Sequence, residues 1–326
     1  MSTQKEQIKL QQAKIKKYNN IFKNIIGLEE AKKAINFSII EPIKRPELFP
    51  LGWDRGILLY GPPGTGKTLL AAETALHVDA EFIEKDSASL NSKWVGGASQ
   101  NVSDLFTRAK EAIRVNKSSK PRPSIIFIDE IDGLFSKDNR VYWNVEMKNQ
   151  FLKEMDGAQD KNRSLHLYLI GATNKPWDLD EGFLRRFQKR IYTGLPNLED
   201  RIELLKLNTK RLELDDSVDI RYISSLMNGY SGSDIKDICR SVHQRTVEEF
   251  LINEELIEGY KPALEDNGRR FMVKDGNFIK FEDSNTIKPN PVSSDDFLTV
   301  IDRRKPSVSP ELLKEYEKWT SKYQAI

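Results

Sequence analysis

Eight consecutive residues form a glycine-rich turn that ends in a lysine and a hydroxyl side chain. They are Gly61, Pro62, Pro63, Gly64, Thr65, Gly66, Lys67 and Thr68, and the helix former Leu69 follows them. Glycines let successive backbone N–H groups turn towards an anion, and the N-terminus of a following helix adds partial positive charge. The Lys67 ammonium can then reach the β- and γ-phosphates of a nucleotide, while the Thr68 hydroxyl binds Mg²⁺. These residues predict a site for a nucleoside triphosphate.

The segments on either side separate this motif from a chance match. Residues 56–60 are a short apolar stretch typical of a buried strand, and residues 69–76 are helix formers throughout. A strand, a glycine-rich loop and a helix in this order are the context that a phosphate-binding loop requires. A glycine turn in front of an ordinary helix is therefore the weaker interpretation.

Two further apolar segments end in polar side chains that could complete the chemistry. Residues 124–128 lead into Asp129 and Glu130, and residues 166–170 lead towards Asn174. We expect Asp129 to hold Mg²⁺ through water and Glu130 to activate the attacking water, the alternative being a strand that ends in solvated acids. Asn174 would hydrogen-bond the γ-phosphate or that water, although taken alone it is as readily an ordinary turn residue.

Arg185 and Arg186 form a pair of permanent positive charges beyond the last of these segments. The fixed donors of arginine suit it to stabilising a transferring phosphoryl group. Because the pair lies far from the loop in sequence, we expect it to act on the nucleotide of a neighbouring subunit. A solvated pair of arginines is the alternative.

The elements that must position these residues alternate between strand and helix. Apolar segments predict strands at 56–60, 81–85, 124–129, 165–171 and 190–193. The alternation indicates an α/β fold, a parallel sheet with helices on both faces. From residue 197 the pattern becomes helical, and it predicts helices at 200–209, 220–227, 232–250, 294–303 and 310–324. Turn residues between short apolar runs predict a small β-hairpin insertion at about 257–292.

We therefore divide the 326 residues into three parts. Residues 1–22 are a polar linker and residues 23–197 a large nucleotide-binding subdomain. Residues 198–326 are a smaller helical subdomain that carries the β insertion (257–292) and the C-terminal helix (310–324).

The amino-acid composition limits the classes of binding partner and the cellular compartment that we expect. The 51 basic and 49 acidic residues nearly cancel, which gives no support for a nucleic-acid partner. The single cysteine, Cys239, excludes an intrachain disulfide and indicates a reducing compartment, and the three histidines lack metal-ligand spacing. Because no apolar run approaches ~18 residues, we expect no direct membrane insertion and a soluble, cytoplasmic protein.

Together these motifs resemble the AAA+ ATPases, specifically the branch that contains katanin, spastin and the ESCRT-III-disassembling vacuolar-sorting ATPase. In the order of that family, the chain has IGLEEA at 26–31, GPPGTGKT at 61–68, IIFIDEID at 125–132, GATNKPWDLD at 171–180, LRRF at 184–187 and GYSGSDI at 229–235. The resemblance implies a ring-forming, usually hexameric ATPase that uses ATP and Mg²⁺. It also implies an AAA+ P-loop domain followed by a smaller helical lid.

The resemblance also implies roles by position. Gly27 and Gly232 would contact the adenine, and Asn174 matches the first sensor. Arg185 and Arg186 match the arginine fingers that act on the neighbouring subunit.

A further segment falls where the family keeps its first pore loop. It comprises Lys93, Trp94 and Val95. Trp94 would line the central channel and grip an extended polypeptide. The alternative is a surface tryptophan packed on its own domain.

Three segments indicate which branch member the chain resembles. The insertion at 257–292 lies where the vacuolar-sorting ATPase carries its β domain, and residues 150–157 and 183–190 look most like the archaeal cell-division members, the CdvC type. We therefore expect a homo-oligomeric motor that threads protein subunits and disassembles ESCRT-III-like filaments, recruited to membrane scission or division sites. Residues 1–20 are too short for the three-helix docking module of such proteins, so we expect either a truncated chain or another means of recruitment.

Three other functions remain open. Microtubule severing of the katanin or spastin type is the main alternative, disfavoured by the near-neutral charge and by the insertion. A non-hydrolysing scaffold is disfavoured by Glu130 and the paired arginines. A DNA-handling motor is disfavoured because no basic stripe is visible.

Overall fold

The computed structural model divides the chain into two compact units. Unit 1 comprises Met1–Leu195 and Val308–Ile326, and unit 2 comprises Pro196–Ser307. The residues that the structure describes are 21–91, 97–115, 122–135, 142–160, 165–256, 260–262, 271–274, 277–280 and 289–323.

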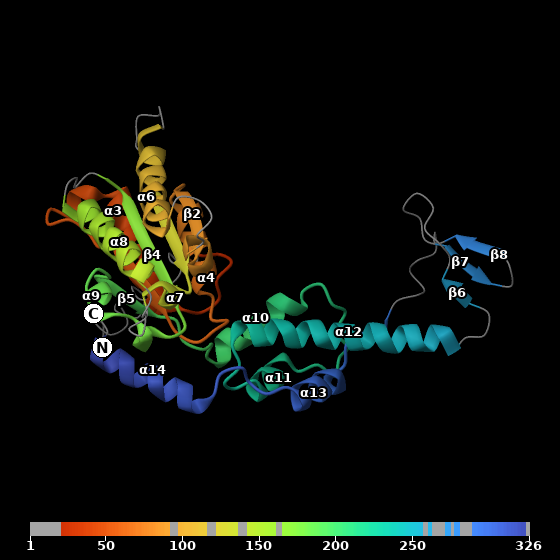
Figure 1. Cartoon of the computed structure of the whole chain (residues 1–326). Helices are drawn as coiled ribbons and strands as arrows, with labels where there is room; N and C mark the ends of the chain where they lie inside the picture. The colour runs from red at the N-terminus through yellow and green to blue at the C-terminus, as the bar shows by residue number, and fades with distance from the viewer. Residues whose placement is uncertain are drawn as a thin grey trace. The chain divides into compact units, whose positions relative to one another are not determined.

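Unit 1 is built on one sheet whose five strands all run parallel (Figure 1). In spatial order the strands are β2 (Glu81–Asp86), β3 (Ser124–Asp129), β4 (Leu167–Thr173), β1 (Gly56–Tyr60) and β5 (Lys189–Tyr192). All five residues of β1 and all seven of β4 are buried, as expected for a parallel sheet covered on both faces. The predicted fold class is confirmed, and the predicted strands lie within two residues of the observed ones.

Side chains of each strand alternate between two separate cores. Leu58 and Tyr60 join the core on one face of the sheet, and Ile57 and Leu59 join the core on the other. The first face packs on α6 (Ala98–Val115), α7 (Asp132–Phe135), α8 (Tyr142–Asp160) and α9 (Glu181–Leu184). The second face packs on α2 (Glu29–Ile35), the π-helix η1 (Asn36–Ile40) and α4 (Lys67–His77). The shorter elements are α3 (Glu41–Lys44), η2 (Pro46–Leu48), α5 (Ser87–Asn91) and η3 (Pro176–Asp178).

The last helix, α14 (Pro310–Tyr323), belongs to unit 1. We expected residues 310–324 in the small subdomain, and the structure corrects this. Tyr316 and Trp319 are buried in the core of the first sheet face, where the Trp319 ring lies 4.6 Å from that of Tyr60. The Tyr60 hydroxyl also donates to Thr320 Oγ1 at 3.0 Å. The aromatic face of α14 is therefore buried against β1 rather than against unit 2.

The start of the chain needs a smaller correction. We expected a polar linker over residues 1–22, but Phe22 is buried in the core of the second sheet face and Ile21 packs against that core. Residues 1–20 lie outside the described part of the chain.

Unit 2 contains a helical core and a small antiparallel sheet. Its helices are α10 (Leu198–Thr209), α11 (Ile220–Leu226), α12 (Gly232–Leu256) and α13 (Ser294–Arg303). Capping boxes formed by Asn197 with Asp200 and by Ser293 with Asp296 fix the starts of α10 and α13, each satisfying two backbone donors.

The β insertion of unit 2 has one strand more than the hairpin that the sequence predicts. Its strands, β6 (Tyr260–Pro262), β7 (Phe271–Lys274) and β8 (Asn277–Lys280), pair in that order. Strands β7 and β8 form an antiparallel hairpin within the predicted insertion.

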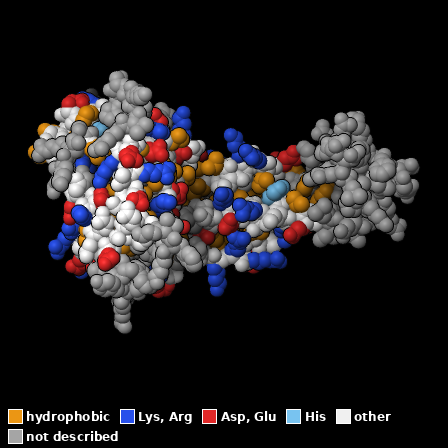
Figure 2. Space-filling model, turned by 45° about the horizontal axis from the view of Figure 1, so that its top comes forward, with side chains coloured by type: hydrophobic (Ala, Val, Ile, Leu, Met, Phe, Trp, Pro, Cys, Tyr) orange, Lys and Arg blue, Asp and Glu red, His pale blue; other side chains and the backbone are white. Residues whose placement is uncertain are grey.

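The described surface carries both signs of charge. Figure 2 shows basic and acidic side chains interspersed over the visible face, in keeping with 51 basic and 49 acidic residues. Among the described residues, no helix is both long enough and apolar enough to cross a membrane.

Candidate active site

The glycine-rich turn joins the end of β1 to the start of α4 and lies close to two other strands. Gly61 has φ 149° and Gly66 has φ 91°, both in the region that favours glycine. A Cβ atom on Gly61 would lie 2.2 Å from the carbonyl oxygen of Thr193, so no side chain fits there. Gly61 N also donates to the carbonyl of Thr173 at 3.3 Å. The turn is therefore held against the ends of β4 and β5.

Thr65, which the sequence places in the nucleotide-binding turn, and Thr193, which it does not predict, stabilise this turn through their hydroxyl groups. Thr65 Oγ1 donates to the carbonyl of Pro62 at 2.9 Å and lies 3.0 Å from Thr193 Oγ1. Thr193 Oγ1 in turn donates to the carbonyl of Tyr60 at 3.2 Å. Thr193 follows β5, and nothing in its sequence surroundings indicates this contact.

Lys67 lies inside the turn and is only 7% exposed. Its Nζ donates to the carbonyl of Gly61 at 2.9 Å and to that of Pro62 at 2.8 Å. Burial lowers the pKa of Lys67 to about 8, and the nearby Asp129 and Asp132 carboxylates limit the shift. An ammonium group whose hydrogen bonds go to neutral carbonyls is well placed to exchange them for phosphate oxygens.

The two predicted magnesium ligands are in direct contact. Thr68 Oγ1 donates to Asp129 Oδ2 at 2.8 Å, which joins the start of α4 to the end of β3. Hydroxyl and carboxylate oxygens are the hard ligands that Mg²⁺ prefers, and this ion commonly completes its shell with phosphates and water. The pair fits a magnesium ion in that manner. No group of three or more His, Cys, Asp or Glu among the described residues could enclose a metal alone.

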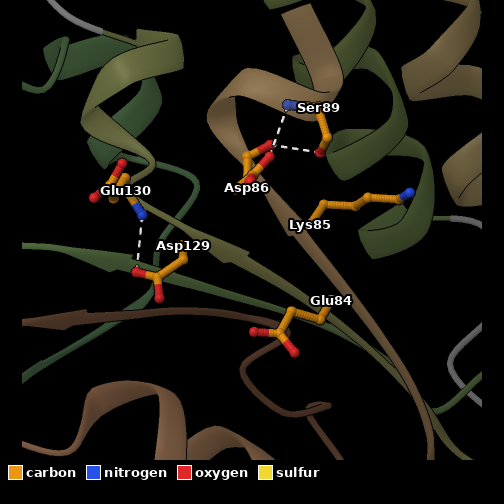
Figure 3. Close-up of a pocket in the computed structure, with 6 residues that line it drawn as sticks. All are labelled: Glu84, Lys85, Asp86, Ser89, Asp129 and Glu130. Atoms are coloured by element: carbon orange, nitrogen blue, oxygen red, sulfur yellow. Dashed lines mark hydrogen bonds between the residues drawn. The ribbon is translucent and has the colours of Figure 1, made fainter.

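Glu130 follows Asp129 in an unusual backbone conformation. Its φ is 49°, a left-handed value that is costly for a residue other than glycine. Its N–H donates to Asp129 Oδ1 at 2.9 Å, and its side chain is exposed. Figure 3 shows Asp129 and Glu130 at one side of a cavity of about 520 Å³. The other lining residues are Glu84, Lys85, Asp86 and Ser89.

Asn174 is held by its neighbours through its backbone, while one side-chain atom, Oδ1, has no partner in the described part of the chain. Its Oδ1 is buried and has no hydrogen-bond partner among the described residues. The preceding Thr173 donates through Oγ1 to Asp132 Oδ1 at 2.6 Å and accepts from Lys175 N at 2.9 Å. The carbonyl of Asn174 accepts from the hydroxyl of Tyr316. Sequence reasoning did not identify Thr173, Asp132 or Tyr316, although the first two lie within quoted motifs.

The two arginines have different surroundings. Arg185 is exposed. Arg186 donates to both oxygens of Asp156 on α8, through Nε at 3.1 Å and Nη2 at 3.0 Å, and its Nη1 donates to the carbonyl of Gly182 at 3.0 Å. The hydrogen bond to Asp156 raises the pKa of Arg186. Arg185 is thus the more accessible of the pair.

The remaining predicted residues are distributed over both units. Gly27 has φ 68° in the turn before α2, where Leu28 Cδ1 lies 3.9 Å from a Cβ atom built on Gly66. That turn is therefore beside the phosphate-binding loop. Gly232 is the first residue of α12 in unit 2. Residues 93–95, the predicted pore loop, lie outside the described residues.

Comparisons with known proteins agree with this geometry. Residues 57–195 match the model for the ATPase family associated with various cellular activities (AAA), and residues 275–323 match the Vps4 C terminal oligomerisation domain. Cell division protein C of Sulfolobus acidocaldarius is 44% identical over 306 residues, which cover 94% of this chain and 72% of that protein. The chain belongs to the AAA ATPase family. It therefore binds nucleotide and hydrolyses ATP, and the predictions of family and enzyme class are confirmed.

This AAA ATPase is also similar to fidgetin-like proteins, in sequence and in structure. Fidgetin-like protein 1 of Drosophila melanogaster is 34% identical over 93% of the chain, which spans 52% of that protein. The crystal structure of the FIGL-1 AAA domain in complex with ADP has a TM-score of 0.73 and 30% identity, covering 93% of this AAA ATPase and 90% of that chain. The likeness extends over both units, because these alignments cover nearly the whole chain.

Proposed function

We propose that this AAA ATPase acts as a ring of identical subunits that extracts protein subunits from ESCRT-III-like filaments during membrane scission or cell division. The observation that carries the proposal is the 44% identity to Cell division protein C over 94% of the chain. The match of residues 275–323 to an oligomerisation domain supports assembly into a ring.

The site residues would share the work of hydrolysis. Lys67 would release its two loop carbonyls and bind the β- and γ-phosphates of ATP, while Thr68 and Asp129 would hold Mg²⁺. Bound Mg²⁺ would neutralise charge that develops on the phosphates. Glu130 would take a proton from the attacking water, and Asn174 would orient that water through its unpaired Oδ1. The backbone N–H groups of residues 64–68 would surround the phosphates, since Pro62 and Pro63 have none.

Subunits would complete one another's sites. The exposure of Arg185 supports its action on the ATP of a neighbouring subunit, with Arg186 beside it. Gly27 and Gly232 would contact the adenine. Trp94, with Lys93 and Val95, would grip an extended chain in the central channel, so that hydrolysis advances the substrate.

The experiment that tests this proposal compares two substrates. Preformed ESCRT-III polymers and microtubules are incubated with the ATPase and Mg²⁺–ATP, and loss of polymer is followed by sedimentation. The Glu130→Gln variant is the control, because it keeps the size of the side chain and one acceptor oxygen but removes the proposed base. We expect loss of ESCRT-III polymer only, and none with Glu130→Gln.

Two other results would contradict the proposal. Severing of microtubules alone would favour a second candidate function, a microtubule-severing ATPase of the katanin or spastin type. The 35% identity to spastin of Danio rerio supports that candidate. Undiminished ATPase activity in Glu130→Gln would show that Glu130 is not the base.

A further inference from the structure

Tyr316 is the residue of α14 that reaches the candidate active site. Its side chain is fully buried, with ring centroids 5.1 Å from Trp177 and 5.9 Å from Tyr192. Its hydroxyl donates to the backbone carbonyl of Asn174. Because the neighbouring aromatic rings hold the Tyr316 ring, its hydroxyl has a single position. The residue that it contacts, Asn174, is the one that we expect to orient the attacking water.

The opposite side of this short segment is fixed as well. Thr173 is anchored to Asp132 at 2.6 Å, and the N–H of Lys175 donates to Thr173 at 2.9 Å. The backbone around Asn174 is therefore held on both sides, whereas the buried side-chain Oδ1 finds no hydrogen-bond partner within the described ranges. A buried acceptor without a partner lowers stability, and such a group in a native site is explained when a ligand supplies the donor.

We propose that Tyr316 is a positioning residue for ATP hydrolysis. It fixes the backbone of Asn174, and thereby the direction of the carboxamide towards the water or γ-phosphate. The proposal rests on the role of Asn174 given under the proposed function. It makes α14 a supporting part of the active site, although no side chain of that helix would touch ATP.

The chemistry of the Tyr316 hydroxyl suits this role. Burial raises the pKa of Tyr316 above its ordinary value, and the acidic groups of Tyr192, Glu315 and Asp132 add to the effect. The hydroxyl therefore keeps its proton at any working pH and remains a donor. A carbonyl can only accept, so loss of this donor leaves the Asn174 carbonyl without its partner.

The test removes one hydroxyl and keeps the ring. Tyr316→Phe is compared in the full chain with Thr320→Val, which removes a different hydrogen bond from the same helix, the one accepted from Tyr60 at 3.0 Å. Each variant is measured for kcat and KM of ATP hydrolysis and for its melting midpoint, well below which the assays are run. Tyr316→Phe is also made in the Asn174→Ala background.

We expect kcat to fall on the order of 10-fold in Tyr316→Phe with little change in KM, because misplacement affects the reacting geometry more than binding. Thr320→Val should keep its kcat even where its melting midpoint falls. In the Asn174→Ala background, Tyr316→Phe should cause no further loss.

Several results would overturn the inference. An unchanged kcat in Tyr316→Phe would do so, as would an equal loss in Thr320→Val, which would indicate general loosening of α14. Losses that multiply in the double variant would show that Tyr316 acts independently of Asn174. A normal kcat in Asn174→Ala would contradict the roles proposed for both Asn174 and Tyr316. The proposed function would still be tested separately by Glu130→Gln and by the polymer experiments.

Discussion

A buried ammonium group lies at the centre of the candidate site. Lys67 donates to the neutral carbonyls of Gly61 and Pro62, and burial lowers its pKa to about 8. Without nucleotide the group is therefore about half charged near pH 8. Phosphate oxygens would favour the charged form and raise its pKa, so nucleotide binding must be linked to proton uptake.

This linkage gives a first prediction, on nucleotide binding and pH. Because the pKa of Lys67 is about 8 when free and higher when bound, proton uptake should be about 0.1 per ATP at pH 7 and approach about 0.9 at pH 9. Affinity for ATP should accordingly decline as pH rises above about 8. Isothermal titration of Glu130→Gln in buffers of different ionisation enthalpy measures the uptake without hydrolysis. Equal uptake at the two pH values would contradict the lowered pKa.

Sequence spacing predicts some of these residues far better than others. Lys67 and Thr68 were predictable from spacing, because binding a phosphate group fixes the distances within a single turn. Lys67 contacts carbonyls of that same turn, and Thr68 contacts Asp129 at the end of the neighbouring strand β3. The contact of Tyr316 with Asn174 joins residues 142 apart. Helical periodicity shows that Tyr316 is on a buried face, but it does not show which atom its hydroxyl meets.

At the scale of elements, α14 shows the limit of sequence patterns most clearly. Its apolar spacing correctly predicted a helix at 310–324 but not the unit on which that helix packs. The deciding contacts are ring contacts with distant strands: Tyr60 lies on β1 and Tyr192 on β5. Strands and helices followed from local periodicity, whereas this packing depends on tertiary contacts that periodicity does not encode.

A second prediction concerns the packing of α14. Trp319 is 6% exposed and lies edge-on to Tyr60, so Trp319→Ala should lower the free energy of unfolding by about 3–5 kcal/mol. The exposed neighbour Lys318 is the matched control, and Lys318→Ala should change the free energy of unfolding by less than about 0.5 kcal/mol. Urea unfolding followed by circular dichroism measures both. A similar effect of the two substitutions would show that α14 is not packed as described.

At the scale of the whole molecule, the proposed function divides each active site between two subunits. Lys67, Thr68 and Asp129 come together within one chain, whereas Arg185 is exposed and, in the proposed function, acts on the ATP of a neighbouring subunit. An active site that needs an arginine from a neighbouring subunit makes ATP hydrolysis dependent on assembly of the oligomer.

This coupling gives a third prediction, on mixed oligomers. Arg185→Ala alone should lower ATPase activity on the order of 100-fold, because the phosphoryl charge loses its donor. Mixing Arg185→Ala with Glu130→Gln subunits should restore activity, since an intact Glu130 can then meet an intact Arg185 across an interface. Glu130→Gln mixed with the Glu130→Gln/Arg185→Ala double variant should show no recovery. Absence of recovery in mixtures that demonstrably co-assemble would place Arg185 outside the neighbouring site.

The return of the chain to unit 1 after unit 2 has a consequence for synthesis. Domains fold as they emerge from the ribosome, and the five strands of the sheet are all made before unit 2 begins. The helix that covers Tyr60 and holds Asn174 is translated only after the whole of unit 2. Until then, the rings of Tyr60 and Tyr192 lack the part of their cover that α14 supplies. A polypeptide released early would carry every phosphate-loop residue and still lack a finished active site.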